Sequence, residues 1–443
     1  MTTRDAAREI WQAALAAGDV RPLIERALHR VGDSAFSVGG VPVEARGRVI
    51  VVGCGKASAA MAAAVEDVLG ERVAGGLVVV KDGYRIPTRH IEIVEGGHPV
   101  PDERGEAAAR AIIERVADAG PDDVVFVLIS GGGSALTPSP APPVTLEEKR
   151  AVTRLLLAGG ATINELNAVR KHLSRFKGGQ LARAAAPARV VTLVLSDVIG
   201  DPLDVISSGP TAPDSSTFAD AILVLQRRGV WDAVPPSVRE RLTAGRAGAI
   251  EETPKPGDPI FQRVENHVIG NNALVTDAAV ARARALGYRA TLLTRSLEGE
   301  AREVAGSLVA RGRALEAPAC LLAGGETTVT VRGGGLGGRC QELALAAALA
   351  MEGADDLVVL AAGTDGTDGP TDAAGAMVDG DTASRIRTAR MDPRALLDQN
   401  DSYRALEASG DLIVSGPTRT NLLDLYIVLR GECPADERSG LTS

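Results

Sequence analysis

RVIVVGCGKAS, residues 48–58, joins an unbroken apolar run to two closely spaced glycines and a lysine. Such a run is typical of a strand that is buried on both faces of a sheet. The segment ASAAMAAAVEDVLG, residues 57–70, reads as the helix that follows. A strand, a glycine loop and a helix in this order form the repeating unit of an α/β fold.

Five further segments repeat the pattern, each with a run rich in Val, Ile and Leu that ends in Gly, Ser or Asp. They are VVFVLISGGGS (124–134), RVVTLVLSDVIGD (189–201), HVIGNNALVTDAA (267–279), LLAGGETTVTV (321–331) and DLVVLAAGTDG (356–366). These runs predict an α/β architecture with largely parallel strands. Because ligands of such sheets bind beyond the carboxyl ends of the strands, the glycine loops are the predicted place of the chemistry.

The length of the chain, 443 residues, predicts two domains. Proline-rich stretches lie at 137–149 and 251–259. The second is the better boundary because a fresh strand and helix pattern follows it, which predicts one domain over residues 1–255 and another over 256–443. The first 30 residues read as helix.

The composition excludes several classes of protein. A formal net charge of -9 and an aromatic content of 2% argue against a nucleic-acid surface. Asp5 and Glu9 stand where a signal peptide would be apolar, and no stretch nears about 18 unbroken apolar residues, so a cytoplasmic protein without a membrane partner is expected. Reduced thiols are expected because no metal or disulfide spacing joins the cysteines Cys54, Cys320, Cys340 and Cys433.

The loop after the first strand favours an anion. Gly53 and Gly55 let backbone N–H groups approach a ligand closely, and Lys56 adds a positive charge. The loop matches a dinucleotide-binding fingerprint only in part, since Ser58 replaces the third glycine, and Ala57 breaks the match to a nucleotide-binding P-loop. A tight turn with an exposed lysine is the alternative.

The stretch SGGGSAL, residues 130–136, raises the question of a nucleophile. A hydrolase elbow needs a second glycine where Leu136 stands, so nucleophilic attack by Ser134 is not expected. Gly131, Gly132 and Gly133 instead fit a backbone cradle for phosphate or carboxylate, with the Ser134 hydroxyl as a further donor. A glycine-rich loop without a ligand is the alternative.

The segment NELNAVRKHLSRFKGG, residues 164–179, reads as a helix because apolar residues recur at positions 166, 169, 173 and 176. It is the densest positive segment of an acidic chain. Lys171 is its candidate for ligand binding, and a solvated helix face is the alternative.

Carboxylates follow two other strands. Asp197 ends the run VVTLVLSD, and Asp365 lies in the loop GTDGTDG. Asp197 can bind Mg²⁺ or accept a hydroxyl proton, while a capping role is its alternative. Asp365, with Asp368 and Asp372 in the same loop, can bind a hard cation shared with phosphates, or substrate hydroxyls. The spacing in the second loop does not match an EF-hand.

The segment GGETTVTVRGGGLGGRCQELAL places Glu326 at a strand end and Arg339 at the start of a helix. An arginine there is well placed to meet phosphate or carboxylate in a bidentate pair, and a turn before a core helix is the alternative. The glycine loops, the two cations and the strand-end carboxylates together suggest phosphoryl transfer with a metal.

These segments resemble, in order, the motifs of the class II glycerate kinases, whose C-terminal part is called the MOFRL domain and whose older members were labelled hydroxypyruvate reductases. The matching segments also include GGHPVPDERG (96–105), LSDVIGDPLDVISSGPT (195–211) and NLLDLY (421–426). The resemblance covers nearly the whole chain. It is softer at GNNAL, residues 270–274, and around Asn421, whose role stays open, and the tail after Cys433 has no counterpart.

The resemblance implies two α/β domains, the larger Rossmann-like with a mainly parallel sheet, and an active site in the cleft between them. It implies phosphorylation of D-glycerate by ATP with Mg²⁺, at the 2-hydroxyl, to give 2-phosphoglycerate and ADP. The active-site lysine and arginine of the family correspond to Lys56 and Arg339. The tolerance for other hydroxy acids is not decided by these motifs.

The resulting hypothesis names Lys56, Arg339 and Asp197 as catalytic and Asp197 or Asp365 as the metal ligand. The residues expected to contact glycerate or ATP are Gly53, Gly55, Ser58, Ser130, Gly131, Gly132, Gly133, Ser134, Lys171, Asn271, Glu326 and Asp365. An NAD(P)H-dependent hydroxypyruvate reductase and a non-catalytic protein that binds phosphorylated metabolites are the alternatives. The sequence leaves the oligomeric state open, with a homodimer as one candidate.

Overall fold

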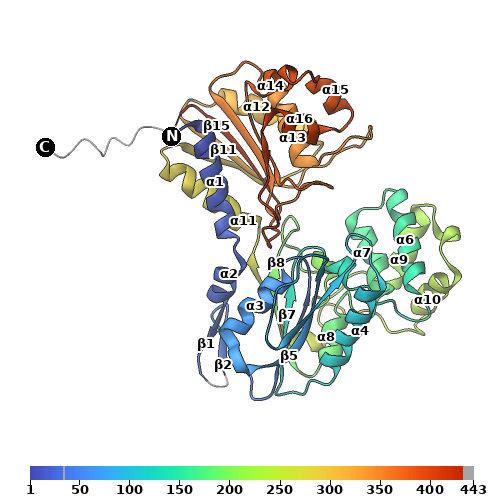
Figure 1. Ribbon diagram of the computed structural model, residues 1–443. Helices are drawn as coiled ribbons and strands as arrows, with labels where there is room; N and C mark the ends of the chain where they lie inside the picture. Colours follow the sequence, from blue (N-terminus) through green and yellow to red (C-terminus); the bar gives the residue numbers. More distant parts are fainter. Residues whose placement is uncertain (33–34, 433–443) are drawn as a thin grey trace. The chain divides into compact units, whose positions relative to one another are not determined.

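The computed structural model describes residues 1–32 and 35–432, so Cys433 lies outside the described residues. The chain divides into two compact units (Figure 1). The larger unit spans Val20–Ile269, and the smaller unit combines Met1–Asp19 with the chain from Gly270 onward. The predicted division into residues 1–255 and 256–443, and the predicted active site between two domains, stay predictions.

The larger unit is built on a six-stranded sheet in the order β6-β5-β4-β7-β8-β9. The strands are β4 (Val49–Cys54), β5 (Val73–Lys81), β6 (Ile91–Gly96), β7 (Val124–Ile129), β8 (Arg189–Leu195) and β9 (Val264–Gly270). The pairs from β6 through to β8 are all parallel, as the apolar runs predict. Chain order reverses direction between β4 and β7, which is the Rossmann-type switch point where such sheets bind ligands.

Helices cover both faces of this sheet (Figure 1). Helix α3 (Ser58–Leu69) packs on one face, and α4 (Glu103–Ala117) and α8 (Gln180–Ala185) pack together on the other. The short helix α5 (Gly133–Leu136) follows β7. A further layer with its own apolar core comprises α6 (Leu146–Ala158), α7 (Ile163–His172), α9 (Phe218–Arg227) and α10 (Pro236–Arg246).

The N-terminal segment contains more than the predicted helix. Helix α1 (Thr3–Ala17) ends at Gly18, and α2 (Val20–Ala27) leads into an antiparallel sheet of β1 (Leu28–Arg30), β2 (Ala35–Val38) and β3 (Val41–Glu44). The expectation of helix over the first 30 residues is therefore wrong at two places, because the helix is interrupted after α1 and because residues Leu28–Arg30 form strand β1. Glycine, with its poor helix propensity, terminates α1.

The smaller unit has a sheet in the order β10-β11-β15-β12-β13-β14. Its strands are β10 (Arg289–Leu297), β11 (Ala319–Gly325), β12 (Leu357–Gly363), β13 (Gly375–Asp379), β14 (Leu412–Ile413) and β15 (Asp424–Arg430). Only β10 and β11 pair in parallel, so the expectation of largely parallel strands is wrong for this unit. Strand β15 inserts between β11 and β12 and runs antiparallel to both, and β13 pairs antiparallel with β12 and β14.

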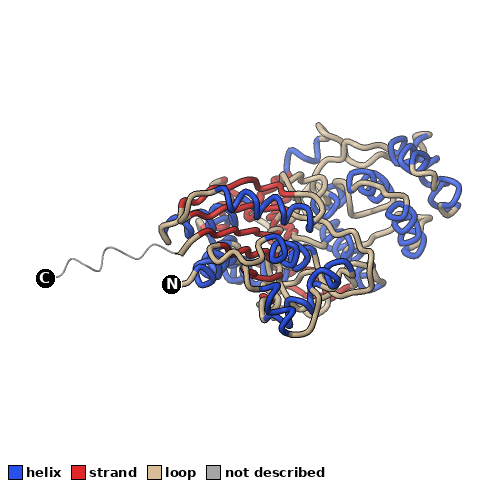
Figure 2. The backbone as a smooth tube through the Cα atoms, turned by 90° about the horizontal axis from the view of Figure 1, so that it is seen from above, coloured by secondary structure: helices blue, strands red, loops and turns tan. Residues whose placement is uncertain are grey.

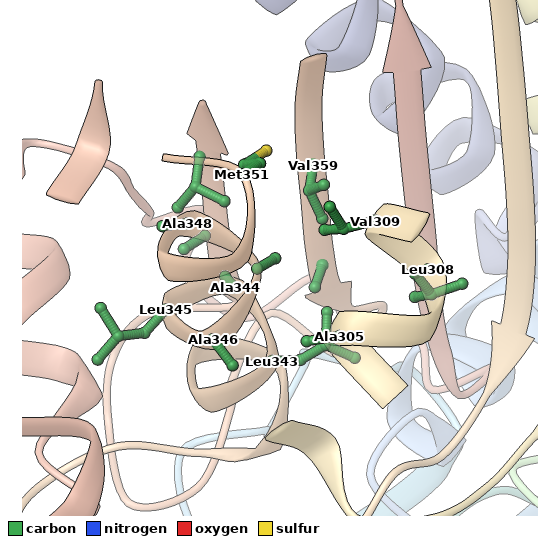
Figure 3. Packing of buried hydrophobic residues seen from close by; sticks show 14 of the residues in the cluster. Ala305, Leu308, Val309, Leu343, Ala344, Leu345, Ala346, Ala348, Met351 and Val359 are labelled. Carbon is green, nitrogen blue, oxygen red and sulfur yellow. The ribbon is translucent and has the colours of Figure 1, made fainter. Parts of the chain in front are cut away.

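Helices also cover both faces of this second sheet (Figure 2). Helices α1 and α11 (Asn272–Ala285) pack together, and α12 (Ala301–Ala314) packs with α13 (Arg339–Ala350) over the main core. In Figure 3, Val309 of α12 lies beside Val359 of β12, and Leu308 of α12 and Leu343 of α13 belong to the same core. The remaining helices are α14 (Thr382–Thr388), α15 (Pro393–Asp398) and α16 (Ser402–Ser409). The buried body of α13 fixes the position of Arg339, its first residue.

Within residues 1–32 and 35–432, every helix is too short or too polar to serve as a bilayer span. Cys54, Cys320 and Cys340 are buried free thiols.

Candidate active site

The loops after β4 and β7 are hydrogen-bonded to each other at the switch point. The Lys56 N–H donates to the Gly131 carbonyl at 2.9 Å, and the Ala57 N–H donates to Ser130 Oγ at 2.9 Å. Ser58 Oγ lies 3.1 Å from Ser130 Oγ, and both serines are fully buried. The two predicted serines therefore join the loops from within, and their hydroxyls do not face solvent.

Close packing of the same loops explains two of the predicted glycines. A Cβ on Gly53 would lie 2.2 Å from the Leu128 carbonyl oxygen. A Cβ on Gly55, whose φ is +135°, would lie 2.2 Å from Ser130 Oγ. Glycine at both positions lets the β4 loop approach the β7 loop, whether or not a ligand also binds there.

The glycine run after β7 borders a pocket. Gly132 has a φ of +86°, and a Cβ there would lie 2.9 Å from the His98 ring. Gly133 packs against Ser207, and Ser134 Oγ lies 2.9 Å from Ser208 Oγ. Gly132 and Ser134 both line the pocket, and the ligand cradle at this loop stays a prediction.

The pocket has a volume of about 480 Å³ and lies wholly in the larger unit. Asp197, which follows β8, is half-buried and is the one carboxylate among the described residues that line it. The basic residues that line it are His98, Lys149, Arg150, Arg154, Arg170 and Lys177. A strongly basic pocket in an acidic protein predicts an anionic ligand.

Lys177 enters this pocket because the helix predicted over 164–179 ends early. Helix α7 stops at His172, and Ser174 Oγ then accepts hydrogen bonds from the Phe176 and Lys177 N–H groups at 3.1 and 3.2 Å. Such side-chain bonds to the backbone compete with helix, and Gly178, with a φ of +59°, continues the turn. The prediction of helix after His172 is therefore wrong, and sequence reasoning missed Lys177.

Burial dominates the electrostatics of the pocket. Lys177 is 1% exposed, and its Nζ donates to the Ser134 carbonyl at 2.7 Å and to the Thr137 carbonyl at 3.3 Å. Burial lowers the pKa of Lys177 to about 7. Burial, followed by repulsion from Lys177 and Arg170, holds the pKa of Lys149 well below its usual range. Burial also lowers the pKa of Arg170.

Lys171, the predicted ligand-binding residue of α7, does not line this pocket. It is 3% exposed, and its Nζ lies 3.3 Å from Asp204 Oδ2 and 3.2 Å from Asp214 Oδ1. It borders a second pocket of about 400 Å³ together with Asn167 and these two aspartates. The buried ion pair gives Lys171 a structural role, so its predicted contact with a ligand stays a prediction.

We expect Lys171→Met to lower the free energy of unfolding by about 3–5 kcal/mol, because it leaves the fully buried Asp214 carboxylate without its cation. Urea unfolding measures this loss. Asp204→Asn is the matched variant, and we expect a smaller effect because Asp204 is 45% exposed. Unchanged stability in Lys171→Met with weakened ligand binding would instead give Lys171 a ligand role.

The smaller unit holds Arg339 in a second cluster. The Arg339 guanidinium donates through Nε to Asp424 Oδ2 at 2.6 Å and through Nη2 to Asp424 Oδ1 at 2.8 Å. Its Nη1 lies 2.9 Å from Glu326 Oε1, at the end of β11 as predicted. Burial alone would lower the pKa of Arg339, but the hydrogen bonds and charge of Asp424 outweigh burial and raise it.

The Asp424 carboxylate is itself oriented by a hydrogen bond. It is fully buried in β15 and accepts a hydrogen bond from the Tyr426 hydroxyl at 3.0 Å. The Tyr426 oxygen accepts one from the Thr327 N–H at 3.2 Å. The segment NLLDLY was predicted as a family motif with no role for Asp424. In the structure, Asp424 fixes the orientation of Arg339.

The other predicted residues of this unit lie near the cluster or cap helices. Asp365 follows β12, is half-buried and accepts from the Thr367 N–H through Oδ1 at 3.0 Å. A Cβ on Gly363 would lie 3.3 Å from Asp424 Oδ1 and 3.5 Å from Asp365 Oδ1, so both carboxylates flank this glycine. Asn271 caps α11, with Oδ1 accepting from the Leu274 N–H at 3.2 Å.

Asp368 anchors the start of α13. It accepts hydrogen bonds from the Cys340 and Gln341 N–H groups at 3.2 and 2.9 Å, and burial raises its pKa to about 6. No group of three or more His, Cys, Asp or Glu side chains that could hold a metal by themselves occurs in the described part of the chain. A metal at Asp197 or Asp365 would therefore need further oxygen ligands, such as water or substrate phosphates.

The fold and the site define an α/β protein with a Rossmann-type unit that carries a basic pocket and a smaller unit that presents a fixed arginine. Residues 6–243 match the family model described as a domain of unknown function (DUF4147), and residues 319–424 match the MOFRL family. The chain belongs to the class II glycerate kinase family, which confirms the resemblance of its motifs.

Two relatives and one solved structure show how far the similarity extends. A protein of Thermotoga maritima named D-glycerate 2-kinase is 48% identical over 86% of this chain and 90% of its own length. A protein of Agrobacterium vitis that carries the hydroxypyruvate reductase label is 44% identical over 97% of this chain and 95% of its own length. The crystal structure of a glycerate kinase from Thermotoga maritima is 43% identical, with a TM-score of 0.84 over 96% of this chain and 99% of that chain.

Proposed function

We propose that this chain transfers the γ-phosphoryl group of ATP to the 2-hydroxyl of D-glycerate, giving 2-phosphoglycerate and ADP. The observation that carries the proposal is the basic pocket at the Rossmann switch point, in a chain that shares 48% identity with a protein named D-glycerate 2-kinase. Phosphoryl transfer relies on positioning and charge neutralisation, and this site offers both. The incomplete dinucleotide fingerprint at Ser58 favours the kinase over a reductase.

The residues divide the work of the reaction as follows. Lys56 and Arg339 neutralise charge on the transferring group, and the loop from Gly131 to Ser134 holds phosphate or the glycerate carboxylate through its N–H groups and hydroxyl. The glycerate hydroxyl oxygen forms the new bond to phosphorus while the bond to the bridging oxygen of ADP breaks. Asp197 orients the hydroxyl and takes its proton.

Mg²⁺ would supply further neutralisation of the phosphates. The chemistry of the lining fits it, because protein sites hold this ion through one or two carboxylates plus substrate phosphates. Asp197 is the carboxylate beside the basic pocket, and Asp365 is the candidate in the smaller unit. We also propose a cytoplasmic enzyme, with a homodimer as the candidate assembly, which light scattering on the purified protein would test.

The function is tested by release of ADP from ATP and Mg²⁺ with a panel of acceptors. We expect release with D-glycerate and little with glycerol, which lacks the carboxylate of the proposed acceptor. NADH oxidation with hydroxypyruvate in the same preparation tests the reductase. No ADP with D-glycerate, together with oxidation of NADH, would overturn the proposal.

A further inference from the structure

Two buried lysines, Lys149 and Lys177, and the half-buried Arg170 line the larger unit's pocket without a carboxylate partner. Lys149 is 7% exposed and Lys177 is 1% exposed. Lys149 Nζ donates to the Leu173 carbonyl at 3.2 Å, and Lys177 Nζ donates only to carbonyls of the loop beyond Ser134. Among the described ion pairs, which include Arg150 with Glu103, none involves Lys149, Arg170 or Lys177.

This arrangement is unfavourable without a ligand. An unpaired charge that leaves water loses its hydration, and carbonyl groups repay only part of that loss. The three cations also repel one another, since Lys177 and Arg170 both contribute to the lowered pKa of Lys149. A cap on a helix end needs one cation, so capping by Lys149 does not explain the group. A bound polyanion would supply the missing partners.

The rest of the pocket indicates which polyanion binds. Its lining also contains apolar residues, namely Val100, Pro101, Pro138, Leu146 and Leu157. Val100 and Leu157 are 64% and 57% exposed. Large apolar side chains gain little from contact with water, so their exposure at the rim of a polar pocket favours an apolar ligand group there. A volume of about 480 Å³ also exceeds what a three-carbon acid needs. The flat base of a nucleotide matches the apolar residues, and its chain of phosphates matches the cations.

We propose that this pocket is the ATP site, with Lys149, Arg170 and Lys177 on the phosphates and the base against Val100 and Leu157. The inference rests on the proposed function for the choice of ATP. It adds three phosphate-binding cations to the predicted Lys56 and Arg339. Its test measures binding, so it does not depend on turnover.

Titration calorimetry with ATP, ADP, pyrophosphate and D-glycerate tests the assignment. We expect Lys177→Met and Lys149→Met to weaken ATP binding by at least about tenfold and to leave D-glycerate binding within about twofold. Lys81→Met, at the end of β5 and outside the pocket lining, is the matched control and keeps wild-type affinity. Val100→Ser weakens ATP but not pyrophosphate, because only ATP brings a base.

Three outcomes overturn the inference. Weakened D-glycerate binding with unchanged ATP binding would make the pocket the acceptor site. Unchanged affinities for every ligand would show that the cations bind no substrate. Equal losses of affinity for ATP and pyrophosphate in Val100→Ser would show that the base does not contact Val100. Wild-type protein that binds ATP but does not phosphorylate D-glycerate would contradict the proposed function and leave the ATP site standing.

Proton uptake gives an independent readout. Lys177 shares the pocket lining with Lys149, Arg170, His98 and Asp197, and the buried Cys54 thiol is a further titratable neighbour outside the lining. With a pKa of about 7, Lys177 is mostly neutral at pH 8. Bound phosphates favour its charged form, so ATP binding at pH 8 should take up a proton, and uptake should diminish toward pH 6. Binding heats in buffers of different ionisation enthalpy measure the uptake. Lys177→Met should remove it, and wild-type binding at pH 8 without uptake would contradict the inference.

Discussion

We expect Lys56→Ala and Arg339→Ala each to lower kcat by about a hundredfold or more, the loss typical of one preorganised charge or donor at a transition state. The lysine follows β4 at the switch point, and the arginine is fixed at the start of α13 by two hydrogen bonds to Asp424. Arg339→Ala also leaves the buried Asp424 carboxylate without its cation, so thermal unfolding accompanies the assay and kcat is taken per folded enzyme. A coupled assay of ADP release with D-glycerate measures the loss.

A double variant and a control sharpen this prediction. If both cations act on one transition state, Lys56→Ala/Arg339→Ala should lose little more than the worse single variant. Arg387→Ala is the control, because Arg387 pairs with Glu352 and is 48% exposed. Near-normal kcat in either single variant would remove that residue from the machinery.

Asp424→Asn should lower kcat by about tenfold to a hundredfold although Asp424 does not need to touch substrate. The amide keeps the shape of the side chain but replaces one acceptor with a donor and removes the charge that partners Arg339. Arg339 then loses the bidentate geometry that aims it. Steady-state kinetics should show the loss in kcat, with the KM for ATP nearly unchanged.

Tyr426→Phe separates positioning from folding. It removes the hydrogen bond of 3.0 Å to Asp424 and the contacts of 3.2 Å with Thr327, and it should cause a smaller loss of kcat than Asp424→Asn because the Asp424 charge stays. Thermal unfolding of both variants provides the stability readout. A variant Asp424→Asn with a lowered melting temperature but unchanged kcat in its folded fraction would show that Asp424 serves stability alone.

The strands of the Rossmann-type sheet could be predicted because the information is local. In β4 and β7 a continuous apolar run ends directly in glycine, and the structure places both ends at the switch point. The predicted strand end at Glu326 and helix start at Arg339 are confirmed for the same reason.

Two features could not be predicted because they depend on distant contacts. Strand β15 reads as one more apolar run, but its partners are set by pairings such as Cys320 with Leu429, far apart in the chain. The role of Asp424 follows from Arg339, 85 residues away. Long-range pairing of this kind leaves no periodic signal in one sequence.

Lys177 was missed for a different reason. The apolar stripe of Leu166, Val169, Leu173 and Phe176 continues past the real end of α7, because Leu173 and Phe176 stay buried after the helix stops. The Ser174 bonds and the glycines that follow override the helical period. A lysine directly before two glycines was the available signal.

The central claim is phosphorylation at the 2-hydroxyl of D-glycerate, and the identity of the product tests it most directly. Purified protein with ATP, Mg²⁺ and D-glycerate is followed by addition of enolase alone. If the enzyme phosphorylates the 2-hydroxyl, we expect direct formation of phosphoenolpyruvate, since enolase consumes 2-phosphoglycerate. Phosphoenolpyruvate that forms only after phosphoglycerate mutase is added would place the phosphate on the 3-hydroxyl and contradict the account.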